Sequence, residues 1–262
     1  MNNEIKNFID VTAPGKKTET GHTHIISQAI RKFEDIFTRL GFELADGPEV
    51  DTEENTWDKL NIPKNHPARD MQDSFWIAGV PQTILRPHTS NVQIRYMEKH
   101  QPPIRIISAG RVFRNESLDA THEAQFHQIE GLMVGKNVSL ANLKAILSQA
   151  LQGFFEDDNL QIRIRPGYFP FVEPGIEVDI TCHKCRGSKP EKTCNVCKGS
   201  GWIEILGAGM VHPNVLKAVN IDSEKYQGFA FGLGVERIVM LKYGIDDIRD
   251  FYDGDIPFLK QF

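Results

Sequence analysis

The feature that most constrains the fold of this chain is the order of its expected helices and strands, which does not alternate regularly. Apolar residues recur at three- and four-residue steps in 22–41 and 139–155, which predicts two amphipathic helices. Strands are expected at 103–116, 124–135, 161–171, 175–181 and 201–210, followed by a short helix at 212–220 and a strand that becomes a helix within 228–244. A doubly wound sheet would need regular alternation, so this order predicts an α+β fold with an antiparallel sheet flanked by helices.

Weaker signals set the expectations for the first hundred residues. The polar stretch 1–20 is typical of an arm or linker, and 42–50 favours a strand interrupted at Gly47 and Pro48. Residues 51–74 are polar and punctuated by prolines, which predicts mostly loop. A hairpin is expected within 74–89, and a short helix at 90–101.

Composition excludes several classes of protein. No apolar run in the 262 residues approaches the roughly 18 that a membrane helix needs. The first ten residues lack the basic and apolar segments of a secretory signal, so we expect a cytoplasmic protein. The net charge of -5 gives no general attraction for nucleic acid, so any polyanion must be held by local arginines or by a partner.

Two of the expected strands have an unusually polar junction. The stretch RVFRNESLDATHEAQFHQIEG places Arg114 and Glu116 at the end of one strand and Gln128 and Glu130 on the next. Because side chains alternate along a strand, the members of each pair point to the same face. Arginine matches a phosphate, and glutamate or glutamine can hold an ammonium or an adenine amine. From spacing alone, a solvated sheet face is an equally good interpretation.

The sequence GFAFGLGVERIVML places Gly232 and Gly234 at a strand-to-helix turn, with Glu236 and Arg237 in the first turn of the helix. Glycines allow the backbone to approach a ligand closely, and a helix N-terminus favours anions. A lone G-x-G usually marks only a turn, but G-x-G-x-E-R after an aromatic strand is more specific.

All four cysteines fall in one short segment, as Cys182, Cys185, Cys194 and Cys197. Two C-x-x-C pairs separated by eight residues, in a chain without a secretory signal, favour a metal site over a disulfide framework. Four thiolates suit Zn²⁺ in a structural site. Four free thiols or a redox pair remain alternatives.

Together these segments resemble the class II aminoacyl-tRNA synthetases. FRNE is similar to their motif 2, GLGVER is similar to motif 3, and the helix and strand ending at Pro48 resemble motif 1. More narrowly, HPARDMQDSFW, LRPHTSNVQIRYM, YFPFVEPGIEVDI and GAGMVHPN resemble, in order, the α chains of bacterial phenylalanyl-tRNA synthetases. The resemblance implies a catalytic domain over 21–262, with motif 1 at about 24–48, motif 2 at about 108–132, motif 3 at about 229–243 and a cysteine insertion at 181–201.

The resemblance also implies a reaction. Phenylalanine and ATP would form phenylalanyl-adenylate by in-line attack of the carboxylate on the α-phosphorus, and the acyl group would then move to tRNA(Phe). Catalysis of this kind rests on positioning and on cationic stabilisation of phosphate charge, and needs no enzyme nucleophile.

The resemblance implies roles for particular residues. For ATP, Arg114 and Arg237 would be the catalytic arginines at the α- and γ-phosphates, with Glu116 and Phe126 at adenine, His122 at the phosphates and Gly234 beside them. For phenylalanine, polar contacts would come from His88, Ser90, Gln93, Gln128 and Glu130, and ring contacts from Phe169, Phe171, Ala230 and Gly232. Glu173 would help to bind Mg²⁺ at the boundary with a β chain.

Several assignments have a structural alternative: ion pairs for Arg114 and Arg237, core packing for His88, Phe169 and Phe171, and a surface carboxylate for Glu173. We expect only structural roles for His22, His24 and His66.

The resemblance implies an α2β2 assembly with a β subunit that supports tRNA binding. The α chains usually begin with a helical coiled-coil arm, whereas these residues begin almost at the catalytic domain, so adenylate formation is implied more directly than grip on tRNA. Three other interpretations are a non-catalytic synthetase-like protein, a zinc-dependent nucleic-acid-binding module, and a synthetase for another amino acid. Arg114 and Arg237 disfavour the first, and the FPF sequence and Ala230 favour phenylalanine over other amino acids.

Overall fold

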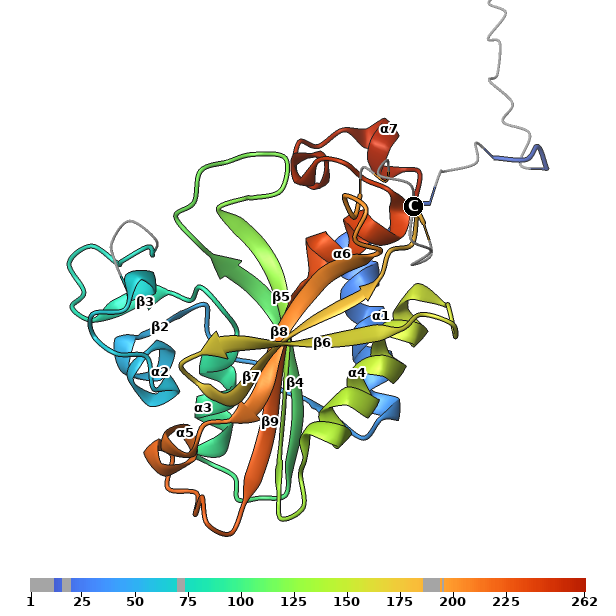
Figure 1. The fold of residues 1–262 in the computed structure, drawn as a ribbon. Coiled ribbons are helices and arrows are strands. Elements are labelled where there is room, and N and C mark those ends of the chain that lie inside the picture. Colours follow the sequence, from blue (N-terminus) through green and yellow to red (C-terminus); the bar gives the residue numbers. More distant parts are fainter. Residues whose placement is uncertain (1–11, 16–19, 70–73, 186–193, 195) are drawn as a thin grey trace, which may run out of the picture.

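The computed structural model describes residues 12–15, 20–69, 74–185, 194 and 196–262. Within them, seven strands form one sheet in the order β1-β4-β5-β9-β8-β7-β6 (Figure 1). All neighbours are antiparallel except β1 and β4. The strands are β1 (Glu43–Leu44), β4 (Ile104–Phe113), β5 (Gln125–Gly135), β6 (Ile162–Phe169), β7 (Val172–Thr181), β8 (Trp202–Val211) and β9 (Gln227–Gly234). The predicted α+β fold with a largely antiparallel sheet is confirmed.

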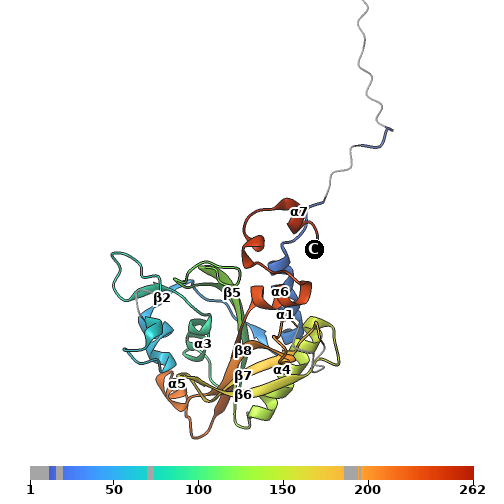
Figure 2. The same cartoon turned by 45° about the horizontal axis from the view of Figure 1, so that its top comes forward.

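Three helices cover one face of this sheet: α1 (Ile25–Arg39), α4 (Leu140–Phe155) and α6 (Val235–Tyr243) (Figures 1 and 2). The Phe33 and Phe37 side chains, one turn apart on α1, are fully buried, and the Phe33 ring stacks on Phe154 of α4 at 4.2 Å between centroids. Gly41, just beyond α1, has φ +82°, a conformation that glycine adopts readily and that commonly ends a helix. The predicted amphipathic helices are therefore present where their apolar periodicity placed them.

Smaller elements cover part of the other face. They are β2 (Val50–Thr52) paired with β3 (Thr83–Leu85), α2 (Glu53–Thr56), the 3-10 turns Asp58–Leu60 and Pro67–Arg69, α3 (Ser90–Met97) and α5 (Pro213–Ala218). A second core that includes Trp57, Ile84, Ile94, Met97 and Leu132 lies beneath them.

This region corrects two expectations. The stretch 51–74, expected to be mostly loop, contains part of β2, the helix α2 and two 3-10 turns, because the Thr52 side chain caps α2 and Trp57 is buried behind it. The expected hairpin within 74–89 is reduced to a single antiparallel bridge between Trp76 and Ile84, since β3 pairs instead with β2. The interrupted strand at 42–50 is divided between β1 and the start of β2.

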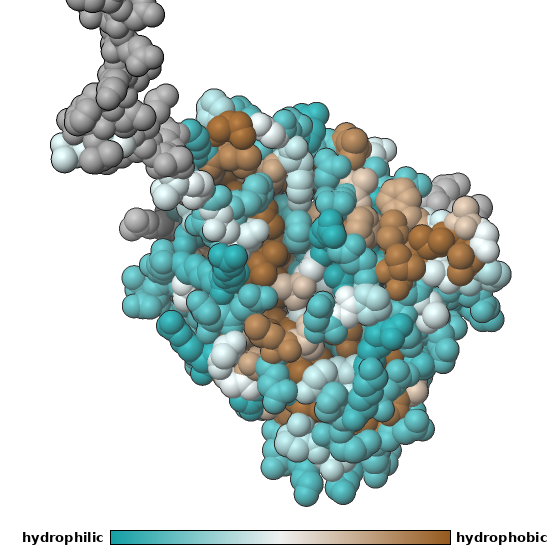
Figure 3. Space-filling model, turned by 180° about the vertical axis from the view of Figure 1, so that it is seen from behind, coloured by the Kyte–Doolittle hydropathy of each residue, from teal (hydrophilic) through white to brown (hydrophobic). Residues whose placement is uncertain are grey.

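The C-terminal residues form a 3-10 helix, Ile248–Phe251, and the short helix α7 (Ile256–Leu259) beside α6 (Figure 2). Most of the expected arm at 1–20 lies outside the described residues. In the described part of the chain, no helix combines the length and apolar character needed to cross a bilayer. The surface seen from behind is mainly hydrophilic, with separate apolar patches (Figure 3).

Candidate active site

Strand β9 presents two different faces. Phe229, Phe231 and Leu233 are buried, whereas the alternate positions are only glycine or alanine. On the neighbouring strand β8, Gly207 pairs with Gly232 and Gly209 pairs with Ala230. This patch of small residues leaves a trough in the sheet on the face opposite α1, α4 and α6.

The trough is the floor of a cavity of about 530 Å³. A Cβ on Gly207 would lie 2.8 Å from the Phe169 ring, and one on Gly232 would lie 3.0 Å from Glu130 Cγ. The space between the Phe169 ring and Glu130 therefore depends on both glycines. The other apolar walls come from Trp57, Leu60, Ile62, Met97, Leu132, Phe171, Val211, Val215 and Ala230.

Glu130 marks the polar end of this cavity and is only 5% exposed. Its carboxylate accepts hydrogen bonds from the Thr89 backbone N–H at 3.0 Å, the Ser90 hydroxyl at 2.5 Å and the Gln93 amide at 3.1 Å. Burial raises the pKa of Glu130, and these hydrogen bonds only partly offset the effect. A cationic ligand would relieve the cost of the buried negative charge.

His88 and Gln128 also line the cavity, and their polar atoms lack partners. Both ring nitrogens of His88 and Oε1 of Gln128 are buried without a hydrogen bond within the described residues. Burial, followed by the nearby Arg114 charge, lowers the pKa of His88 to about 3, so its imidazole is neutral at physiological pH. Buried polar groups are normally paired, so these orphaned atoms indicate a polar ligand.

A second cavity of about 230 Å³ adjoins the first and shares Arg114, Glu116 and Gln128 as lining residues. It is also lined by His122, Phe126, Gly234, Glu236 and Arg237. Arg114 and Glu116 lie just beyond the end of β4, so the strand stops three residues earlier than expected. The guanidinium of Arg114 donates to Pro87 O at 3.1 Å and lies 5.0 Å from the centroid of the Phe126 ring.

Arg237 projects from the first turn of α6 and makes no hydrogen bond or ion pair with the described residues. The preceding residue, Glu236, is buried and accepts from the His127 backbone N–H at 2.9 Å, the His127 ring at 2.8 Å and the Tyr252 hydroxyl. The helix turn is thus fixed while the arginine remains available. A guanidinium that has no partner in the described part of the chain and lies beside a helix N-terminus is suited to an anion.

His122 belongs to an exposed loop between β4 and β5. Its ring hydrogen-bonds Asp119 at 3.0 Å, and the loop contacts the C-terminal segment through a hydrogen bond from Ile248 N–H to Ala120 O at 3.0 Å. One wall of the second cavity is therefore an exposed surface loop, whereas the polar end of the first cavity is formed by β5 and the first turn of α3.

Glu173 lies outside both cavities. Its side chain is 76% exposed, and its carboxylate is 3.7 Å from the His212 ring. Among the described residues it is not part of any cluster of three or more metal-ligating side chains. Glu173 alone would make a weak Mg²⁺ site, so further ligands would have to come from a nucleotide or a partner chain.

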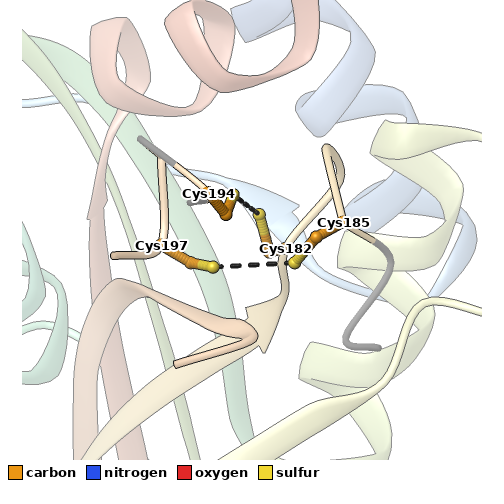
Figure 4. Close-up of side chains that lie close together, drawn as sticks. All are labelled: Cys182, Cys185, Cys194 and Cys197. Carbon is orange, nitrogen blue, oxygen red and sulfur yellow. Dashed lines mark hydrogen bonds between the residues drawn. The ribbon is translucent and has the colours of Figure 1, made fainter. Parts of the chain in front are cut away.

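The four cysteines converge between the ends of β7 and β8 (Figure 4). Their sulfur atoms all lie within 4.8 Å of one another, with 3.8 Å between Cys182 and Cys194 and 3.6 Å between Cys185 and Cys197. A tetrahedral zinc site with Zn–S bonds of about 2.3 Å requires sulfur separations of about 3.8 Å. The donor set and its spacing fit one zinc ion, and no cysteine lines either cavity.

Several lining residues were not anticipated from the sequence. His66, expected to be structural, lines the larger cavity, as do Trp57, Leu60 and Ser74 from the segment expected to be loop. His24 is structural as expected, because it caps α1 through Ile26 N–H. The polar, proline-containing sequence around His66 predicted a loop and did not indicate that the loop would cover the sheet.

Comparisons with known proteins agree with one another. The family described as "tRNA synthetases class II core domain (F)" matches residues 8–262. Curated relatives called "Phenylalanine--tRNA ligase alpha subunit" include one from Streptococcus thermophilus at 55% identity and one from Streptococcus agalactiae at 54%, each over 97% of this chain and 72% of the relative. A crystal structure of pyrrolysyl-tRNA synthetase from Desulfitobacterium hafniense has a TM-score of 0.66 at 18% identity, covering 89% of this chain and 75% of that one, which supports the fold alone.

Proposed function

This chain belongs to the family of class II tRNA synthetase core domains, and from that premise we propose that it activates L-phenylalanine with ATP and transfers it to tRNA(Phe). The observation that carries this proposal is the pair of adjoining cavities. One cavity is apolar with a buried carboxylate. The other contains Arg237, which has no partner among the residues that the structure describes, and Arg114 lines both cavities.

In the larger cavity, the phenyl ring of the substrate would lie in the trough against Phe169, Phe171 and Ala230. Edge-to-face contacts with aromatic rings favour a phenyl group. The ammonium would pair with Glu130, which Ser90 and Gln93 already hold in place. Neutral His88 and the free Oε1 of Gln128 would supply the remaining polar contacts.

In the smaller cavity, ATP would place its α-phosphate at Arg114 and its γ-phosphate at Arg237. Glu116 and Phe126 would contact adenine, His122 would reach the phosphates, and Gly234 would allow close approach of the nucleotide. The position of Arg114 between the cavities suits a group that must stabilise charge on the α-phosphate while the amino acid carboxylate attacks it. In this scheme the protein's own residues act by binding and orientation.

We propose two metals. Mg²⁺ would accompany ATP and neutralise phosphate charge, with Glu173 contributing to a site shared with a partner subunit. Zn²⁺ would be held by Cys182, Cys185, Cys194 and Cys197 in a structural role, since these thiols lie outside both cavities.

The partners follow from the same proposal. The relatives' designation as an alpha subunit supports assembly with a β subunit, which we propose to be an α2β2 tetramer acting on tRNA(Phe) in the cytoplasm. A net charge of -5 makes strong tRNA binding by this chain alone unfavourable, so tRNA affinity should depend on the partner.

The test is phenylalanine-dependent exchange of pyrophosphate into ATP, measured with this chain alone and with a β subunit added. Exchange in either reaction supports the proposal, and the difference measures the contribution of β. Tyrosine in place of phenylalanine is the control for substrate class. Absence of exchange with both chains present would instead favour a non-catalytic synthetase-like protein.

A further inference from the structure

We infer that Asp51 is a positioning residue for the amino-acid site, and that it acts by fixing α3, the helix that contributes Ser90 and Gln93. This inference rests on the proposed function. Asp51 lies outside both cavities and would touch neither substrate. Its effect would be transmitted through the helix.

The Asp51 carboxylate is enclosed by donors. Its side chain is 0% exposed, and it accepts two hydrogen bonds from Arg95, at 2.7 and 2.6 Å, and one from the Asn91 amide at 2.8 Å. The Thr52 backbone N–H at 2.7 Å and the Asn55 amide at 3.1 Å complete the set. A buried carboxylate with this many partners fixes its neighbours firmly.

The contacts of α3 divide between two faces. Ser90 and Gln93 hydrogen-bond Glu130, whereas Asn91 and Arg95 hydrogen-bond Asp51. At 3.6 residues per turn, the centres of these two pairs are about 150° apart around the helix. The first turns of α3 are thus held between two buried carboxylates on nearly opposite sides.

The hydrogen bonds on both sides fix the rotation of α3 about its axis and its position along that axis. Apolar packing of Ile94 and Met97 keeps α3 against the second core but is not directional. The hydrogen bonds to Asp51 are directional, and they determine where the Ser90 hydroxyl and the Gln93 amide lie relative to Glu130. If Asp51 lost its charge, Arg95 and Asn91 would lose acceptors and the helix could shift while remaining folded.

The test compares Asp51→Asn with Arg95→Gln, which breaks the same ion pair from its half-exposed side. The matched control is Asp179→Asn, because Asp179 is also a buried carboxylate held by two arginines, Arg163 and Arg165, but lies outside both cavities. Pyrophosphate exchange with the full chain and its partner gives KM for phenylalanine and for ATP. Calorimetry gives phenylalanine affinity without ATP, and thermal melts report stability.

We expect Asp51→Asn and Arg95→Gln each to raise KM and Kd for phenylalanine by about tenfold or more, since small displacements in a site are costly. KM for ATP should change less than about twofold, and the double variant should be little worse than either single one. Asp179→Asn should lower Tm with no change in KM for phenylalanine. If Asp51→Asn fails to fold, Arg95→Gln alone decides.

Unchanged phenylalanine KM and Kd in both variants, with only reduced stability, would overturn the inference and assign Asp51 a purely structural role. Equal rises in KM for phenylalanine and ATP would also overturn it, because the effect would not be specific to α3. A wild-type protein that neither exchanges pyrophosphate nor binds phenylalanine would overturn the proposed function and this inference together.

Discussion

The two cavities of this protein differ in how completely they are built before a ligand arrives. In the larger one, Glu130 already accepts three hydrogen bonds and sits on a central strand. In the smaller one, Arg237 has no partner among the described residues and one wall is an exposed loop. If the proposed assignment of the cavities is right, amino-acid selection depends on a polar site that is already hydrogen-bonded, whereas the triphosphate is bound by arginines that keep donors available.

The largest effect should come from the smaller cavity. Arg237→Ala should reduce kcat for pyrophosphate exchange by about 100- to 1000-fold, because it removes a cation from the phosphates in the transition state. Phenylalanine affinity measured by calorimetry without ATP should hardly change. Arg249→Ala is the control, since Arg249 is exposed and paired with Asp247 outside both cavities. Loss of phenylalanine binding in Arg237→Ala would show that the cavities are not separate in function.

The next effect should come from the larger cavity. Glu130→Gln should weaken phenylalanine binding by about tenfold to a hundredfold through loss of a charge-assisted contact to the ammonium, with KM for ATP little changed. Ser90→Ala, which removes one of the three bonds to Glu130, should have a smaller effect. An unaffected phenylalanine KM in Glu130→Gln would place the ammonium elsewhere.

The same carboxylate predicts a pH dependence. Only ionised Glu130 can pair with the ammonium, and burial raises its pKa above the usual range. Phenylalanine affinity should therefore decline as pH falls through this raised pKa, at a higher pH than for an exposed glutamate. Glu130→Gln should abolish that part of the profile. Calorimetric Kd values across the acidic range would measure it, and identical profiles in both proteins would exclude Glu130 as the titrating group.

Removing a metal should affect neither cavity directly. The purified protein should contain about one equivalent of zinc, and chelation should lower Tm by about 5–10 °C through loss of the link between β7 and β8. KM values measured well below the melting transition should be unchanged, since no cysteine lines a cavity. A metal-free preparation of unchanged stability would contradict the zinc proposal.

The smallest change should refine the shape of the larger cavity. Ala230→Gly removes one methyl group from the wall beside the trough and should admit para-substituted phenylalanines, with a modest loss for phenylalanine itself. Pyrophosphate exchange with a set of para-halogenated analogues would measure this. An unchanged substrate profile would show that the end of the phenyl pocket has been misplaced.

The sequence predicted the strands and long helices well because their apolar patterns are local. Arg114, Glu116, Gln128 and Glu130 could be grouped because they lie at the end of one strand and on the strand that follows it. The structure places the first three where the two cavities meet, and Glu130 in the larger cavity beside them. The segment 51–74 could not be interpreted in this way. Its fold depends on long-range packing of Trp57 and on the burial of Asp51 by α3, and neither has a periodic signature.

Gly207 illustrates a different limit of sequence reasoning. A glycine within a strand signals only a bend or a close approach, and the approaching group cannot be read from the chain. Only the fold reveals that the ring of Phe169 occupies the space a side chain would need.

The alternation along β9 has a consequence for how this gene can vary. The side chains of Phe229, Phe231 and Leu233 are buried in the core on the side of α1, α4 and α6, where volume-conserving apolar exchanges should be tolerated best. A Cβ on Gly228 would lie 2.7 Å from Met133 O, and one on Gly232 would lie 3.0 Å from Glu130 Cγ. A carbon added at Ala230 would extend into the larger cavity. A saturation scan of this strand should therefore show tolerance that alternates from one residue to the next. The buried apolar positions should accept several similar residues, whereas larger residues at the alternate positions should lower activity or change the substrate preference.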